Sequence, residues 1–357
     1  MEKDSKNDVV IELKNVWKIF GENAKDAYQD ICDNNISKSE VLEKYDCVVG
    51  VADANLEIYR GEIFCIMGLS GSGKSTLVRH INRLLEPTSG DITVNGRDVL
   101  SLNLKELRNF RNEHISMVFQ NFALLPHRSV IDNVALPLEI RGLPKNQRMD
   151  TAKKALDLVD LSDWGNKFAH ELSGGMQQRV GLARALAVDS QVLLMDEPFS
   201  ALDPLIRRQL QSEFMKLAKT MNKTTVFITH DLDEAVRIGH RIAIMRDGRM
   251  VQIGTAEDIV MNPADEYVEE FVSGISRFKL IRAHAIMVDV KRYEDEKGPL
   301  PKEIITFSES EKLEIILSTA ADSDVPIGIT NSSLEIVGII DRAILLKEII
   351  EGASENG

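Results

Sequence analysis

The stretch GLSGSGKST, Gly68 to Thr76, decides the fold class of this 357-residue chain. It fits the pattern of a glycine, four further residues and then Gly-Lys-Ser without a mismatch. The apolar run EIFCIM precedes it at 62–67, and STLVRHINRLL follows it at 75–85 with apolar residues at helical spacing. A strand, a tight loop and a helix in this order predict an α/β domain with a phosphate-binding loop.

That loop has the chemistry to bind a polyphosphate. Glycine permits positive φ and a close backbone approach, the backbone amides point inward, and the following helix N-terminus adds partial positive charge. We expect Lys74 to reach the β- and γ-phosphates of a nucleotide and Ser75 to hold Mg²⁺. The residues expected to bind the nucleotide here are Gly68, Ser70, Gly71, Gly73, Lys74, Ser75 and Thr76. For this stretch alone, a structural glycine turn is the alternative.

A pair of carboxylates follows a second apolar run, in VLLMDEPFSALD at 192–203. The four apolar residues suit a buried parallel strand that ends at Asp196 and Glu197. The carboxyl end of a strand is where open α/β sheets bind ligands, so Asp196 can meet the Mg²⁺ held by Ser75. Glu197 is then placed to polarise a water for attack on the γ-phosphate. Without the phosphate loop, surface acids would be the better interpretation.

A second glycine-rich stretch, LSGGMQQR at 172–179, also has features of an anion site. It reads as a loop entering a helix, with Ser173 as the N-cap and with Gly174 and Gly175 leaving backbone amides bare. Because Lys74 already serves the chain's own phosphates, this end suits a dimerising switch that awaits a second subunit. A simple N-cap is the alternative.

Taken in order, GLSGSGKST, VFQNFALLPH, LSGGMQQR, LLMDEP, SALD and FITHD resemble the ATP-binding cassette ATPases over residues 9–273. The resemblance implies a P-loop NTPase domain with a mixed sheet core, an antiparallel β subdomain and a helical subdomain. It also implies a homodimer. Two subunits face head to tail, and the Ser-Gly-Gly of one closes over the ATP bound by the other.

The same resemblance assigns roles to residues outside the two glycine-rich loops. Gln120 matches the glutamine that senses Mg²⁺ and the attacking water, and Asp203 matches the loop that communicates between the two sites. His230 matches the histidine that contacts the γ-phosphate. Phe20 is the candidate for the aromatic residue that stacks on adenine, with Trp17 as its rival.

The domain pattern predicts an ATP-binding domain at 1–276 and a smaller domain at 277–357. A polar, helix-prone insertion at 21–50 interrupts the first, and the segment from SVIDNVALPLEI to LSDW reads as helices separated at Pro144. The helical face expected to be buried there consists of Ala152, Ala155, Leu156 and Val159.

The tail at 325–350 reads as strand, polar turn, strand and helix. It resembles one cystathionine-β-synthase (CBS) type repeat, which implies a small CBS-like α/β domain. Relatives usually place Thr and Asp for an adenosine ribose where this chain has Asp341 and Ile344, which argues against adenine-nucleotide sensing. We expect the tail to pair with its copy and to tune activity with ionic strength, because SRFKLIR contributes Arg277, Lys279 and Arg282. A dimer brace without a regulatory role is the alternative. The helical face expected at its end consists of Ala343, Leu346, Ile349 and Ile350.

The insertion, and the sequence around GLSGSGKST and LLMDEP, resemble the ATP-binding subunits of glycine betaine, proline and related quaternary-amine importers. This implies import of glycine betaine, choline, proline betaine or trimethylamine N-oxide, with a membrane-spanning permease and a solute-binding protein as partners. Amino-acid and polyamine importers are the alternative. In NFALLPH, the apolar residues Phe122, Leu124 and Leu125 resemble the surface that receives a permease helix, although a buried turn is equally compatible.

Composition limits the other function classes. A net charge of −13 argues against a nucleic-acid surface. The chain shows no signal peptide and no apolar run long enough to span a bilayer, so we expect a peripheral subunit at the cytoplasmic face of the membrane. A DNA-repair ATPase would carry a long coiled coil between Lys74 and Ser173, and a translation factor of this family would carry two GKST motifs. A purely regulatory nucleotide binder would lack a catalytic pair such as Glu197 and His230.

Overall fold

The computed structural model describes residues 8–346 except 121, 201, 274–281, 302–303 and 322–324. Its contacts divide the chain into two compact units, Met1–Thr255 and Ala256–Gly357. This division lies before the expected boundary at 276. In the second unit, Glu257 forms ion pairs with Arg282 and His284, which ties the first helix of that unit to the segment after residue 281.

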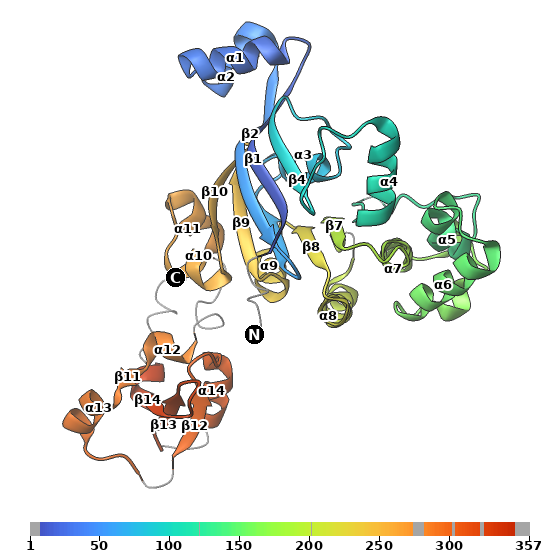
Figure 1. Cartoon of the computed structure of the whole chain (residues 1–357). Coiled ribbons are helices and arrows are strands. Elements are labelled where there is room, and N and C mark those ends of the chain that lie inside the picture. The colour runs from blue at the N-terminus through green and yellow to red at the C-terminus, as the bar shows by residue number, and fades with distance from the viewer. Residues whose placement is uncertain are drawn as a thin grey trace. The chain divides into compact units, whose positions relative to one another are not determined.

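The first unit is built on a six-stranded mixed sheet of order β10-β9-β3-β8-β7-β6 (Figure 1). All neighbours are parallel except β9 and β10. The strands are β3 (Ile63–Met67), β6 (Ile115–Val118), β7 (Val192–Asp196), β8 (Thr224–Ile228), β9 (Arg241–Arg246) and β10 (Arg249–Gly254). Every residue of β3, β7 and β8 is buried, as expected for central parallel strands covered on both faces. The expected mixed sheet and its central strands are therefore confirmed.

A four-stranded antiparallel sheet of order β2-β1-β4-β5 lies beside the mixed sheet. Its strands are β1 (Val9–Phe20), β2 (Val48–Tyr59), β4 (Ser89–Val94) and β5 (Arg97–Asp98). Both sheets share one apolar core with helix α3 (Lys74–Ile81), in which Ile11, Ile58, Phe64 and Leu77 are buried. The helix that follows the phosphate loop is thus fixed between the sheets.

Helices α5 (Val130–Ile140), α6 (Lys145–Asp157) and α7 (Gly174–Leu186) pack on one another and form the helical subdomain (Figure 1). Pro144 is the N-cap of α6, so the predicted break between two helices is confirmed. The expected buried face of Ala152, Ala155, Leu156 and Val159 is also confirmed. Outside the insertion, the described helical segments of the unit also include α4 (Leu104–His114), η2 (Ser162–Trp164), η3 (Ala169–Glu171), α8 (Pro204–Met221) and α9 (Leu232–Ile238).

The insertion forms two helices, α1 (Ala24–Asn34) and α2 (Lys38–Tyr45), and its last residues start β2. Asp30 joins the helices by accepting hydrogen bonds from Lys44 and Tyr45. The Lys44 ammonium, followed by Asn34 and Tyr45, lowers the pKa of the Asp30 carboxyl to about 2. A small apolar cluster beneath these helices contains Trp17, Ile19, Ala27, Val41 and Cys47.

The second unit contains a four-stranded sheet of order β11-β14-β13-β12. The strands are β11 (Val288–Asp289), β12 (Ile305–Ser308), β13 (Ile327–Thr330) and β14 (Ile336–Ile340). The helices are α10 (Ala256–Met261), α11 (Glu266–Val272), α12 (Ala283–Ile286), α13 (Val290–Lys297) and α14 (Leu313–Ala321). Strand, turn, strand and the start of a helix after 341 follow the predicted order, so a small α/β unit is confirmed. Arg277, Lys279, Ile349 and Ile350 lie outside the described residues.

Candidate nucleotide-binding site

The loop between β3 and α3 needs glycine for steric reasons at two positions. Gly68 has φ +146° and Gly73 has φ +99°, and a Cβ on Gly73 would lie 2.3 Å from the Gly50 carbonyl oxygen. A second strand-connecting turn supports the loop, since Gly248 N–H donates to Ser72 O at 2.9 Å. A Cβ on Gly71 would meet nothing within 4 Å, so the loop is open on that side. Such a loop can cradle a polyphosphate with its backbone amides.

Lys74 is 5% exposed and folds over this loop. Its ammonium Nζ donates to Gly68 O at 2.7 Å and to Leu69 O at 2.9 Å. Burial lowers the pKa of Lys74, and the carboxylates of Glu197 and Asp196 oppose that shift. The ammonium therefore lies at the loop, within the electrostatic influence of Asp196 at the end of β7 and of Glu197 directly after it.

Ser75 and Asp196 meet as predicted. Ser75 Oγ donates to Asp196 Oδ1 at 2.7 Å, and Asp196 is 1% exposed. Arg79 Nη2 contacts the other carboxylate oxygen at 3.3 Å. Sequence reasoning missed Arg79, although its position one helical turn after Ser75 places it on the same face of α3. A hydroxyl and a buried carboxylate are hard oxygen donors, so the pair fits Mg²⁺ that takes its other ligands from phosphate and water.

Three predicted catalytic side chains converge at the carboxyl ends of β6, β7 and β8. Gln120 Nε2 donates to Glu197 Oε2 at 3.3 Å, and His230 Nδ1 lies 3.2 Å from the same oxygen. Because these strands are neighbours in the sheet, segments far apart in the sequence reach one edge. This arrangement can hold a water next to a phosphate that is bound at Lys74.

The second glycine-rich stretch, at 172–179, packs against residues outside the phosphate loop. Ser173 caps α7, with its Oγ accepting from Met176 N at 3.3 Å, so the predicted N-cap is confirmed. A Cβ on Gly174 would lie 3.8 Å from Phe122 Cζ, and one on Gly175 would lie 3.5 Å from Leu202 and Ile206. These contacts within the described part of the chain do not include the phosphate loop. Asp203, nearby, caps α8 by accepting from Ile206 N at 3.1 Å.

Exposure separates the two aromatic candidates for the adenine. Phe20 is 40% exposed, and its ring lies against Gly50, whose carbonyl lies against Gly73 of the phosphate loop. Trp17 is 9% exposed, packs edge-on to Tyr28 and lies under Arg249. Phe20 is thus the aromatic ring that is both exposed and next to the loop.

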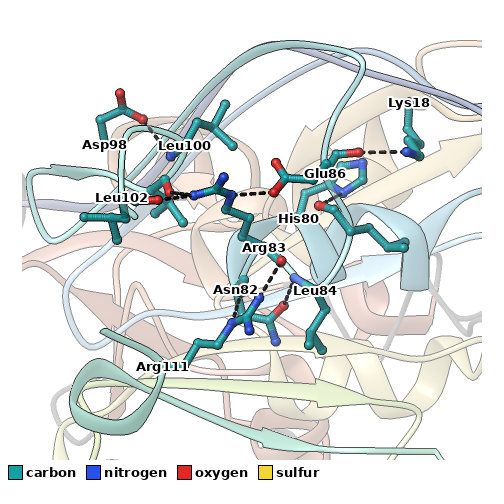
Figure 2. Close-up of polar contacts among 12 residues, drawn as sticks. Lys18, His80, Asn82, Arg83, Leu84, Glu86, Asp98, Leu100, Leu102 and Arg111 are labelled. Carbon is teal, nitrogen blue, oxygen red and sulfur yellow. Dashed lines mark hydrogen bonds and ion pairs between the residues drawn. The ribbon is translucent and has the colours of Figure 1, made fainter. Parts of the chain in front are cut away.

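The far end of α3 is anchored by two arginines (Figure 2). Arg111 donates to Asn82 O at 2.8 Å and to Arg83 O at 2.6 Å, and cations are favourable at a helix C-terminus. Arg83 itself donates to Leu102 O at 2.7 Å and forms an ion pair with Glu86. Helix α3 is therefore held at both ends, which fixes Lys74 and Ser75 relative to the sheet.

In the part of the chain that the structure describes, no helix combines the length and the apolar character that a membrane crossing requires.

Comparison with known proteins agrees with this geometry. The ABC transporter family profile matches residues 51–200. The chain is 50% identical to the glycine betaine transport ATP-binding protein OpuAA of Bacillus subtilis, over 82% of this chain and 69% of that protein. It is 44% identical to the trimethylamine N-oxide transport system ATP-binding protein TmoW of Pelagibacter ubique, over 96% of this chain and 98% of that protein.

A solved structure has the same fold. The ATP-binding cassette MJ0796, in a dimeric post-hydrolysis state bound to ADP and Pi, is 32% identical with a TM-score of 0.59, over 69% of this chain and 98% of that chain. The site geometry and these relatives lead to one conclusion. The chain belongs to the ABC transporter family, as one of its ATP-binding proteins.

Proposed function

We propose that this chain is the ATP-hydrolysing subunit of a binding-protein-dependent importer for glycine betaine or a related quaternary or methylated amine. The convergence of Gln120 and His230 on Glu197, beside Lys74, is the observation that carries the ATPase. The amine class rests on relatives whose names specify glycine betaine, proline betaine, choline or trimethylamine N-oxide.

Each side chain has a defined task in hydrolysis. The amides of the phosphate loop and Lys74 bind the β- and γ-phosphates, while Ser75 and Asp196 would hold Mg²⁺, which neutralises developing charge when bound. Glu197 orients the attacking water and accepts its proton, and His230 steadies the γ-phosphate. The Gln120 side-chain amide donates to Glu197, which orients the water. Gln120 therefore connects the position of that water to the position of the loop at 122–127.

A second copy of this chain completes the site. The N-terminus of α7 carries Ser173, Gly174 and Gly175, and their contacts within the described chain do not include its own phosphate loop. This helix end would therefore bind the ATP held by the partner. Asp203, which starts the neighbouring helix α8, would carry the signal between the two sites. Phe20 would stack on adenine, because it is exposed next to the loop and Trp17 is covered.

The membrane-spanning permease would dock between the sheet and the helical subdomain. A cavity of about 390 Å³ lies there, with apolar walls from Leu84, Phe119, Leu136 and Ile140. The loop with Phe122, Leu124 and Leu125 starts next to it, so closure of the dimer can reach the permease through residues 120–127. The chain would then lie at the cytoplasmic face of the membrane as a peripheral subunit.

The residues after 276 would form a CBS-like domain that pairs with its copy and senses ionic strength. Of the basic stretch, Arg282 forms an ion pair with Glu257, while Arg277 and Lys279 lie outside the described residues. Asp341 accepts a hydrogen bond from Ile344 N at the start of the following helix and forms an ion pair with Lys297. The carboxylate expected to face a nucleotide is therefore already paired within the chain.

Deletion of residues 277–357 tests this role of the tail. Surface attraction is screened over about 10 Å at 0.1 M salt, so the assembled importer without the tail should lose the salt dependence of its ATPase activity. The measurement is ATP hydrolysis in liposomes across a salt series. If ATPase activity depended on salt in the same way with and without residues 277–357, the tail would have only a structural role in the dimer.

The amine class is tested with the chain assembled with its permease and solute-binding protein in liposomes. Glycine betaine, choline, trimethylamine N-oxide, proline and a polyamine are compared as stimulators of ATP hydrolysis. We expect severalfold stimulation by at least one methylated amine, because solute capture is coupled to closure of the dimer. Stimulation by the polyamine alone would leave the ATPase in place and contradict the amine class.

A further inference from the structure

Arg184, on α7, makes two strong contacts that the nucleotide chemistry above does not use. Its Nη1 donates to Ala123 O at 2.6 Å, and its Nη2 donates to Phe122 O at 3.0 Å. The planar guanidinium therefore holds two successive carbonyls of the loop that begins at Gln120. Such a pair fixes both the distance and the orientation of the loop relative to the helix.

The surroundings make these bonds costly to break. Burial lowers the pKa of Arg184, so its charge has lost hydration that the two carbonyls replace. Ala123 has φ +49°, a left-handed conformation that residues with a Cβ rarely adopt. A strained backbone of this kind persists only when its surroundings hold it in place. The two bonds from Arg184 hold this turn against α7, while Asn133 holds the same loop at Leu125.

The other end of α7 meets the same loop. A Cβ on Gly174 would lie 3.8 Å from the ring of Phe122, and Ser173 caps the helix at that end. Helix α7 has 13 residues and is about 20 Å long. One rigid element therefore carries the glycines that would face the partner's ATP and also holds the loop after Gln120.

We propose that Arg184 is a positioning residue that couples the second copy's nucleotide to Gln120 of this chain. The proposal rests on the proposed function and deepens it. When ATP on the partner draws the start of α7 into place, Arg184 carries the loop at 122–123 with the helix. Gln120 already donates to Glu197 in the single chain, and closure of the dimer would hold this contact in place, so hydrolysis depends on both copies.

Arg184→Lys is the first test, because lysine keeps the charge but can no longer hold both carbonyls in one plane. In the assembled importer we expect kcat for ATP to fall about tenfold, with KM and nucleotide binding within about twofold. In a Gln120→Ala background the same substitution should lower kcat less than about twofold further, because it acts through Gln120. Independent, multiplicative losses would overturn the proposal.

Arg141→Lys is the matched control. Arg141 is also a half-buried arginine that donates to two carbonyls, Val188 O at 2.9 Å and Asn112 O, but it holds no part of the loop after Gln120. This variant should keep kcat within about twofold, even if it unfolds at a lower temperature. An equal loss of kcat in both variants would mean that Arg184 only supports the fold.

A measurement on the unsubstituted importer covers the case in which Arg184 variants do not fold. Hydrogen exchange at residues 122–127 and at 174–177 should slow together when ATP and vanadate trap the closed dimer. Protection of one segment without the other would contradict the coupling. An importer that hydrolyses no ATP at all would instead contradict the proposed function.

Discussion

His80 is a buried titratable residue of the phosphate-loop helix, and it makes the fold sensitive to acid. Its side chain is 0% exposed, Nδ1 lies 3.0 Å from Leu85 O (Figure 2), and Nε2 has no hydrogen-bond partner among the described residues. Burial, opposed by the hydrogen bond to Leu85 and assisted by the nearby Lys18, lowers the pKa of His80 to about 4. Unfolded histidine titrates near 6.5, so the unfolded chain binds a proton first as the pH falls. The stabilisation from neutral His80 is complete at higher pH and is lost between about 6.5 and 4.

We therefore predict that His80 removes about 1 to 2 kcal/mol of unfolding free energy between pH 7 and pH 5. In His80→Asn the amide can keep the hydrogen bond to Leu85 O, and the titration is gone. Urea unfolding at both pH values should show the midpoint of the unsubstituted chain falling more than that of the variant. Parallel falls in the two proteins would show that other groups cause the acid sensitivity.

The contiguous motifs predicted which residues lie on the phosphate loop and at the end of the neighbouring strand, because local sequence determines both positions. The phosphate loop and the strand end at Asp196 each depend on neighbours in the sequence, and the Ser75–Asp196 contact followed from them. Arg79, Gly50 and Gly248 were missed because their roles arise from packing between segments that are distant in the chain. The sequence left Phe20 and Trp17 as alternatives, and the exposed fraction of each ring, which favours Phe20, is not contained in any sequence pattern.

At the scale of elements, helix and strand periodicity predicted several helices and strands of the first unit. Pro144 marked the start of α6, and the all-apolar runs marked the buried strands β3 and β7. The order of strands in the sheet was the missing information. Only the neighbouring positions of β6, β7 and β8 bring Gln120, Glu197 and His230 to one oxygen atom. The insertion was predicted as helix-prone, but the bonds from Lys44 and Tyr45 that close it on Asp30 were not.

At the scale of the whole molecule, the account depends on a second copy of the chain. The start of α7 carries Gly174 and Gly175 directly after the Ser173 N-cap, while Lys74 donates to the phosphate loop of its own chain. In the proposed function one chain holds two half-sites, and two chains facing head to tail would make two complete ones. The sequence could predict this arrangement only through its resemblance to a family, because a contact between copies leaves no periodicity in one chain.

Glu197→Gln with Mg-ATP is the measurement that tests this central claim most directly. Glutamine keeps the shape of the side chain and its contacts but cannot accept the proton of the attacking water, a loss typically of 10²- to 10⁴-fold. Glu43→Gln, on the exposed side of α2, is the control for a removed charge. We predict that Glu197→Gln binds ATP normally, hydrolyses it at least about 100-fold more slowly, and sediments as an ATP-dependent dimer. A variant that hydrolysed ATP at the normal rate, or that stayed monomeric with bound ATP, would contradict the account.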